Sequence, residues 1–121
     1  MRKRTPNTSQ VRDLLQKEKE KKIMNASVAI QVVPKTSNDD ETIRIVDEVL
    51  AYIKSTGLNY FVGPSETSIE GDFDELMEVV KECQKVAARA GAKSISSYVK
   101  TVYRPEGEVL TIEQKVTKHH Q

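Results

Sequence analysis

The sequence predicts an α+β fold in which one antiparallel sheet of four strands carries two helices on one of its faces. Two stretches with the apolar period of a helix, ending near Gly57 and Gly91, each follow a run typical of a strand. Two further strand-like runs complete the order β-α-β-β-α-β, and glycine or proline residues separate most of the segments. This order is that of the ferredoxin-like arrangement.

The first strand and the first helix are expected between residue 27 and Gly57. Residues 27–33 alternate in part between apolar and polar side chains, and Pro34 ends this strand. The helix begins within residues 36–41, where capping residues are followed by acids that suit the positive end of the helix dipole. The apolar stripe of the helix is expected to comprise Ile43, Val46, Leu50 and Ile53.

A turn separates the second and third strands, and the third strand leads directly into the second helix. Residues 60–62 are a short apolar run, Gly63-Pro64 indicates the turn, and residues 67–70 alternate like a half-buried strand. Asp72 begins the helix, because Glu75 three residues later fits a capping box. The buried stripe of this helix is expected to comprise Phe73, Leu76, Met77, Val80, Cys83, Val86, Ala87 and Ala90.

The last strand is expected at residues 95–103, and a short terminal helix at residues 111–118. The residues expected to face the two long helices are Val28, Ile30, Val32, Ile95 and Val99. The opposite face would carry Ser27, Ala29, Gln31, Glu66, Ser68, Glu70, Ser96, Tyr98 and Lys100. This polar face is either solvated surface, or it meets a second subunit or a ligand, since a single-layer sheet gains by covering its open face.

The composition indicates one small globular domain. The chain has 121 residues, 31% of them charged, and its longest apolar run is far shorter than the roughly 18 residues of a membrane span. The basic N-terminus lacks the apolar stretch of a signal peptide. One cysteine, Cys83, excludes an internal disulfide and agrees with a reducing compartment, so we expect a cytoplasmic protein without a membrane partner.

The charges divide the chain into two parts. Residues 1–23 carry eight basic and three acidic residues, a net charge of +5, whereas residues 24–121 carry eleven and fifteen, a net charge of −4. We interpret residues 1–23 as a mobile basic extension and residues 24–121 as the ferredoxin-like domain. The acidic domain disfavours a nucleic-acid surface. The alternative for the extension is an arm that binds RNA or another partner.

The sequence offers no evident catalytic or metal site. His119 and His120 are adjacent at the C-terminus, and Cys83 lies on an apolar helical stripe without a nearby histidine, so we expect a buried, inert thiol. The acids at the two helix starts lack the spacing of a calcium loop. We therefore expect a protein that is not an enzyme, with no catalytic residue, no metal and no required cofactor.

Several segments together resemble the thiamine-binding-like family of small proteins. The most specific is the pattern Thr-x-x-Glu-Gly at residues 67–71 directly before the helix start at residues 73–75; segments 29–34, 90–93 and 99–100 add to it. The resemblance covers about residues 24–118. It implies a ferredoxin-like fold, assembly into homodimers or homotetramers through the sheets, and binding of thiamine or its hydroxymethylpyrimidine portion.

The resemblance also implies a ligand site. Thr67 and Glu70 match the motif, and Lys100 matches the lysine of the last strand; we add Gln31 and Tyr98 from the same polar face. A carboxylate at Glu70 can accept hydrogen bonds from an aminopyrimidine, and Tyr98 can stack on its ring. We expect Thr67 and Glu70 to lie near Tyr98 in one concavity. The alternatives are that Glu70 pairs with Lys100, that Thr67 satisfies nearby backbone, and that Tyr98 is interface or surface.

We therefore interpret the chain as a non-catalytic binding protein for thiamine or a related pyrimidine or cationic heterocycle, acting as an oligomer. The alternative is an enzyme, or a regulatory subunit, with an unidentified reaction on the same fold. In this chain Ser65-Glu66 stands where relatives often have Met-Gly, and Pro34-Lys35-Thr36-Ser37 lacks the glycine that many relatives have after the first strand.

Overall fold

The computed structural model describes residues 7–12 and 24–119. Its sheet consists of β1 (Ala26–Pro34), β2 (Asn59–Val62), β3 (Thr67–Gly71) and β4 (Ile95–Tyr103). The helices are α2 (Asp39–Ser55), α3 (Phe73–Arg89) and the short α4 (Ile112–Val116), which a 3-10 turn (Thr117–His119) follows. These elements confirm the expected order of strands and helices, including the short terminal helix.

The sheet has the strand order β2-β3-β1-β4, and all neighbouring strands are antiparallel. The ferredoxin-like prediction is therefore confirmed. β1 pairs with β4 along its whole length, whereas only residues 26–30 of β1 pair with β3. The last residues of β1 consequently have a strand neighbour on one side only.

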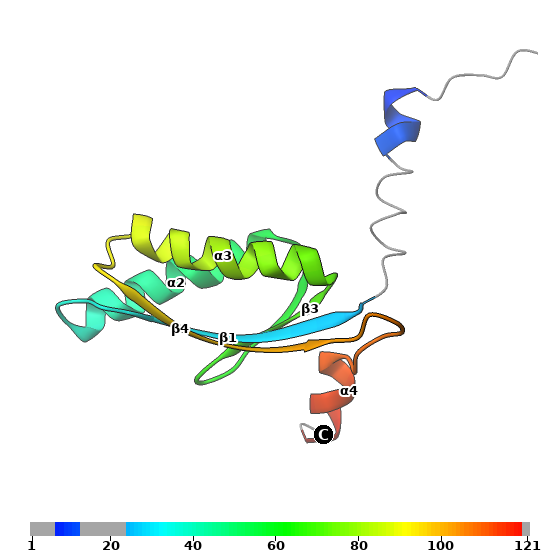
Figure 1. The fold of residues 1–121 in the computed structure, drawn as a ribbon. Coiled ribbons are helices and arrows are strands. Elements are labelled where there is room, and N and C mark those ends of the chain that lie inside the picture. The colour runs from blue at the N-terminus through cyan, green and yellow to red at the C-terminus, as the bar shows by residue number, and fades with distance from the viewer. Residues whose placement is uncertain (1–6, 13–23, 120–121) are drawn as a thin grey trace, which may run out of the picture.

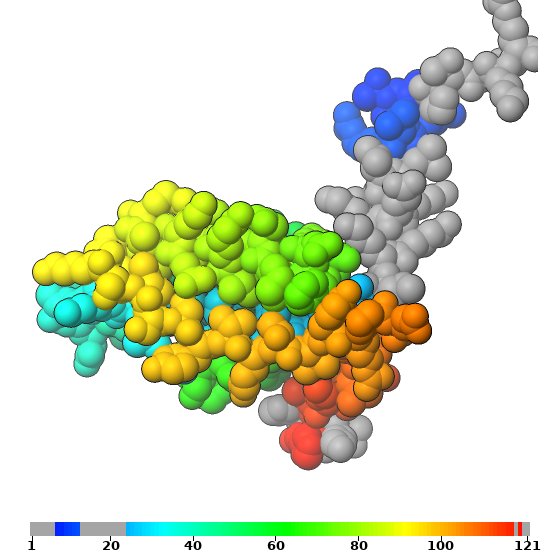
Figure 2. Space-filling model, viewed as in Figure 1, coloured from blue at the N-terminus to red at the C-terminus, as the bar shows by residue number. Residues whose placement is uncertain are grey.

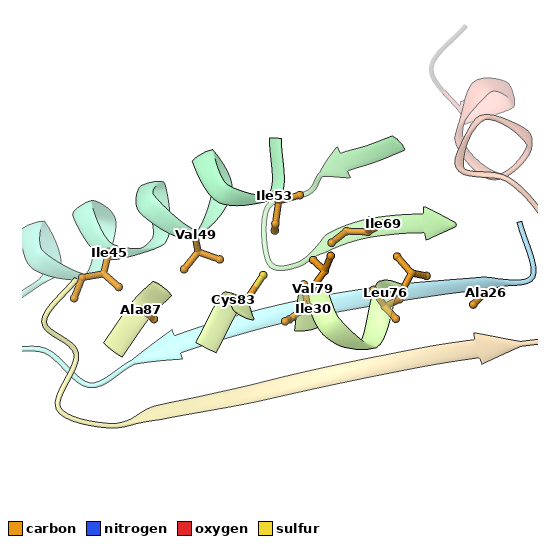
Figure 3. Packing of buried hydrophobic residues seen from close by; sticks show 11 residues of the cluster. Ala26, Ile30, Ile45, Val49, Ile53, Ile69, Leu76, Val79, Cys83 and Ala87 are labelled. Atoms are coloured by element: carbon orange, nitrogen blue, oxygen red, sulfur yellow. The ribbon is translucent and has the colours of Figure 1, made fainter. Parts of the chain in front are cut away.

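The two long helices lie side by side on one face of the sheet, and α4 lies on the other face (Figure 1). The apolar core fills the space between the long helices and the sheet, where Ile30 and Ile69 are almost completely buried (Figure 3). Val28 is buried there too. Because side chains alternate along a strand, the neighbouring residues of β1 and β3 point to the opposite face. We call that opposite face the open face.

The stripe by which α2 meets the core differs from the expected one. The buried residues are Ile45, Val49 and Ile53, spaced four apart, whereas Ile43 is 59% exposed. Val46 and Leu50 lie at the edge of the buried stripe and line a pocket. The helix is therefore rotated relative to our expectation, although Ile53 belongs to both stripes.

The second helix agrees better with the sequence. The buried residues of α3 are Leu76, Val79, Cys83 and Ala87, of which Val79 alone was not expected. Asp72 caps the helix by accepting a hydrogen bond from the Glu75 amide, at 3.2 Å. The side chain of Asn25, just before β1, accepts a second bond from the Phe73 amide at 2.9 Å, which ties the helix start to the sheet.

The N-terminal extension lies largely outside the described residues. Within it, residues 8–12 are helical and residues 7–12 are exposed. The prediction of a mobile basic extension at residues 1–23 concerns mostly residues that the structure does not describe. Over the described ranges, no helix has the length and apolarity needed to cross a membrane.

Candidate ligand-binding site

A pocket of about 270 Å³ lies between α2, the end of β1 and the turn that joins β2 to β3. Its apolar wall is formed by one side of α2 together with the end of β2. Residues 30–32 of β1 and residues 63–67 form the remaining wall. The residues that α2 and β2 contribute are Val46, Val49, Leu50, Ile53 and Val62.

The pocket exists because β1 continues beyond β3. The last pair between these strands is Ile30 with Thr67, and residues 31–34 pair with β4 alone. One edge of β1 therefore lacks a strand partner at this place, and the turn at residues 63–66 stands opposite it. The Gly63 amide donates to the Glu66 carbonyl at 2.9 Å and closes this turn. A Cβ atom at residue 63 would lie 2.8 Å from that carbonyl oxygen, so the turn needs glycine.

Thr67 is the polar residue of this pocket that is most informative. It faces the helices, is 5% exposed, and lines the pocket at the first position of β3. Among the described residues, the fully buried side-chain oxygen without a hydrogen-bond partner is that of Ser97, and the Thr67 hydroxyl is not such an atom. A hydroxyl group at a pocket wall can both donate and accept a hydrogen bond, which makes Thr67 a candidate contact for a ligand.

Glu70 does not share this pocket. It is 3% exposed and faces the open side of the sheet, opposite Ser27 of β1. Its carboxylate accepts hydrogen bonds from the Asn59 side chain at 2.5 Å and from the Ile112 amide at 2.7 Å. The expected shared concavity of Thr67 and Glu70 is thus wrong, because residues three apart on a strand point to opposite faces.

The alternative pairing of Glu70 with Lys100 is also wrong. The Lys100 ammonium lies 2.9 Å from a carboxylate oxygen of Glu66, and both side chains are partly exposed. Tyr98 is 65% exposed on the open face. Its neighbour across the ladder is Gln31, which also belongs to the pocket lining. The five expected site residues therefore divide into Thr67 and Gln31 at the pocket, and Glu70, Tyr98 and Lys100 on the open face.

Neither the apolar pocket wall nor the turn at residues 63–66 was expected to be part of a site. The expected first strand, residues 27–33, is longer than the expected third strand, residues 67–70, so the sequence already indicated that the first strand extends past its neighbour. The contribution of Val46 and Leu50 could not be recognised, because both had been assigned to the core stripe of α2.

The outer surface between α2 and α3 carries a wider and more open hollow, lined by residues that include Arg44, Glu48, Tyr52 and Arg89. Its cations already have partners. The Arg44 guanidinium pairs with Glu41 at 2.8 Å, and the hydrogen bond from Arg44 lowers the pKa of that carboxyl group. Arg89 pairs with Glu82 and lowers the pKa of Glu82 in the same way. This surface therefore offers less to a ligand than the pocket at Thr67.

Cys83 is a buried core residue and not an exposed nucleophile. The thiol of Cys83 is completely buried in the core, and this burial raises its pKa to about 12. Such a thiol carries almost no thiolate at neutral pH, which agrees with the expected inert cysteine. Within residues 7–12 and 24–119, no group of three or more His, Cys, Asp or Glu side chains is arranged to hold a metal ion.

Comparison with known proteins gives one consistent result. The sequence profile of a family described as thiamine-binding protein matches residues 28–120. A UPF0045 protein of Clostridium perfringens is 39% identical over 93 residues, which cover 77% of this chain and 95% of that protein.

Solved structures agree with this assignment. A domain of unknown function, DUF77, from Bacillus cereus has a TM-score of 0.71 and 34% identity, covering 79% of this chain and 90% of that one. A proposed thiamine biosynthesis/salvage protein from Thermotoga maritima has a TM-score of 0.69 and 36% identity, covering 78% of this chain and 98% of that one. The profile match spans well over half of the chain, and this protein therefore belongs to the thiamine-binding protein family.

Proposed function

We propose that this protein binds thiamine or a related pyrimidine in the pocket at Thr67 and releases it chemically unchanged. The observation that carries the proposal is the position of Thr67, which contributes a hydroxyl side chain to the wall of an otherwise largely apolar pocket. Membership of the thiamine-binding protein family supports the ligand class.

The size and walls of the pocket favour the pyrimidine portion over a larger ligand. Ligand pockets commonly span ~300–1,000 Å³, and this one, at about 270 Å³, suits a single ring. Its α2 wall is apolar, which favours the faces of a flat heterocycle. The Thr67 hydroxyl can donate to a ring nitrogen or accept from an exocyclic amine. The unpaired edge of β1 offers backbone groups of both kinds.

The charge of the pocket favours a neutral ring inside it. Among its described lining residues Glu66 alone is ionisable, and Lys100 already pairs with that carboxylate. The cationic thiazolium of thiamine would then lie toward the pocket mouth and solvent, where its charge stays hydrated.

Isothermal calorimetry with thiamine and with hydroxymethylpyrimidine tests this proposal. We expect Thr67→Val, which keeps the shape of the side chain and removes the hydroxyl, to weaken binding at least tenfold, or about 1.4 kcal/mol. Thr101→Val is the matched control, because Thr101 is exposed on β4 and is not part of the pocket lining. Equal affinities of the Thr67→Val variant and the parent would contradict the proposal.

We further propose that the protein assembles as a cytoplasmic homodimer or homotetramer through the open face. Tyr98, Val102 and Val33 support this, because they lie on that face and are 65%, 53% and 41% exposed. Native mass spectrometry of the parent and of Tyr98→Glu tests it: we expect an oligomer that the added charge dissociates. A monomeric parent would contradict assembly.

A further inference from the structure

The C-terminal segment, residues 105–119, crosses to the face of the sheet that α2 and α3 leave uncovered. In Figure 1 α4 lies beneath the sheet, and in Figure 2 the same segment lies against the far end of β4. The Val109 amide donates to the Met24 carbonyl at 3.0 Å, next to the start of β1. Val109 and Ile112 are 5% and 6% exposed, so two apolar side chains of the segment are buried.

This segment divides the open face into a covered and an uncovered end. At the end near the start of β1, Ser27 and Glu70 face this side and are almost completely buried. Farther along the same face, Tyr98 and Lys100 of β4 remain exposed. α4 contacts β3, so the covered end is the one that carries Glu70.

One carboxylate joins the sheet to this segment. The Ile112 amide is the first of α4, and such an amide has no partner within its own helix. It donates to one oxygen of Glu70, while the Asn59 side chain on β2 donates to the other oxygen. Thr111 and Gln114 satisfy each other in a capping box, at 2.8 and 3.0 Å. The bond between Ile112 and Glu70 thus connects an already capped helix to the sheet.

We propose that Glu70 is a positioning residue that fastens residues 105–119 as a strap over one end of the open face. Loss of its carboxylate releases the strap and leaves the sheet and the two long helices folded. With the strap closed, the end of the face that carries Gln31, Tyr98 and Lys100 stays open to a second copy of the chain. This inference does not depend on the proposed ligand, because neither Glu70 nor residues 105–119 line the pocket.

Hydrogen–deuterium exchange of the full chain, read by mass spectrometry of peptides, tests the strap. For Glu70→Ala we expect exchange in residues 109–116 to rise at least tenfold, while exchange within α2 and α3 stays as in the parent. Glu66→Ala is the matched control: it also removes a glutamate from this face, but one whose partner is Lys100. We expect it to leave the strap protected.

A second variant keeps the test decisive if Glu70→Ala folds poorly. Asn59 is exposed, so Asn59→Asp should fold, and it places a second carboxylate against Glu70. We expect repulsion between the two carboxylates to open the strap. Parent-like protection of residues 109–116 in both variants would overturn the inference. Equal acceleration throughout the domain would overturn it too, because Glu70 would then support the whole fold.

Discussion

Thr67 and Glu70 belong to the same five-residue strand, yet their side chains meet different surroundings. Thr67 faces the helices and lines the pocket beside α2. Glu70 faces the other side, where both carboxylate oxygens accept hydrogen bonds from within the chain. Both residues match the same family motif, but only Thr67 contributes to the wall of the pocket.

The difference teaches that burial alone does not indicate a binding residue. Both side chains are at least 95% buried. A buried polar group whose partners belong to the protein stabilises the fold, because removing it leaves those partners unsatisfied. A polar group at a pocket wall can instead donate to or accept from a ligand. Changes at Glu70 should therefore affect mainly stability, and changes at Thr67 mainly affinity.

The largest effect is expected at Ile69, which lies between the two residues and holds β3 against the core. Ile69 is completely buried, so Ile69→Ala should lower the free energy of unfolding by about 2–5 kcal/mol. Ile43→Ala is the control, because Ile43 is 59% exposed on α2 and should change stability by less than about 0.5 kcal/mol. Urea denaturation measures both. Similar losses at the two positions would contradict the observed rotation of α2.

The second prediction separates the roles of Thr67 and Glu70. Glu70→Ala should lower the free energy of unfolding by about 1–3 kcal/mol, because the Asn59 side chain and the Ile112 amide lose their acceptor. It should leave the affinity for thiamine unchanged. Thr67→Val should keep stability within about 0.5 kcal/mol of the parent, or raise it, and should lose affinity. Urea denaturation and calorimetry on the same two variants test this.

One result would reverse the comparison between these two positions. If Glu70→Ala lost affinity for thiamine as strongly as Thr67→Val, the carboxylate would belong to the ligand site as the family motif first suggested. The contacts to Asn59 and Ile112 would then have to open when the ligand binds.

Most of the fold was predictable because its signals are local. Alternation in β1 placed Val28 and Ile30 in the core, and Asp72 with Glu75 marked the start of α3. The rotation of α2 was not predictable in this way. Its apolar residues satisfy two overlapping stripes with helical spacing, one through Ile43 and one through Ile45. Only packing against the sheet and α3 decides between them.

The candidate site was less predictable, for two different reasons. The odd separation of Thr67 and Glu70 already places them on opposite faces of a strand, so a shared concavity conflicts with the alternation itself. The partners of Glu70 were unpredictable for a different reason. Ile112 contributes a backbone amide from 42 residues away, and a backbone amide leaves no signature in the sequence. The ligand roles of Gln31, Tyr98 and Lys100 stay predictions.

The smallest effect is expected for the ion pair between Glu66 and Lys100, which connects the pocket turn to the open face. Its side chains are 38% and 73% exposed, so a double-mutant cycle with Glu66→Gln and Lys100→Gln should give about 0.2–1 kcal/mol of stability, decreasing with added salt. The exposed pair Glu78–Lys81 on α3 is the control, since it should be equally weak and lies away from the pocket. A second double-mutant cycle, measured on the binding free energy of thiamine, tests whether the open face influences the pocket. Coupling at Glu66–Lys100 but not at Glu78–Lys81 would show that it does so through this turn. Zero coupling at both pairs would mean that the two faces act independently.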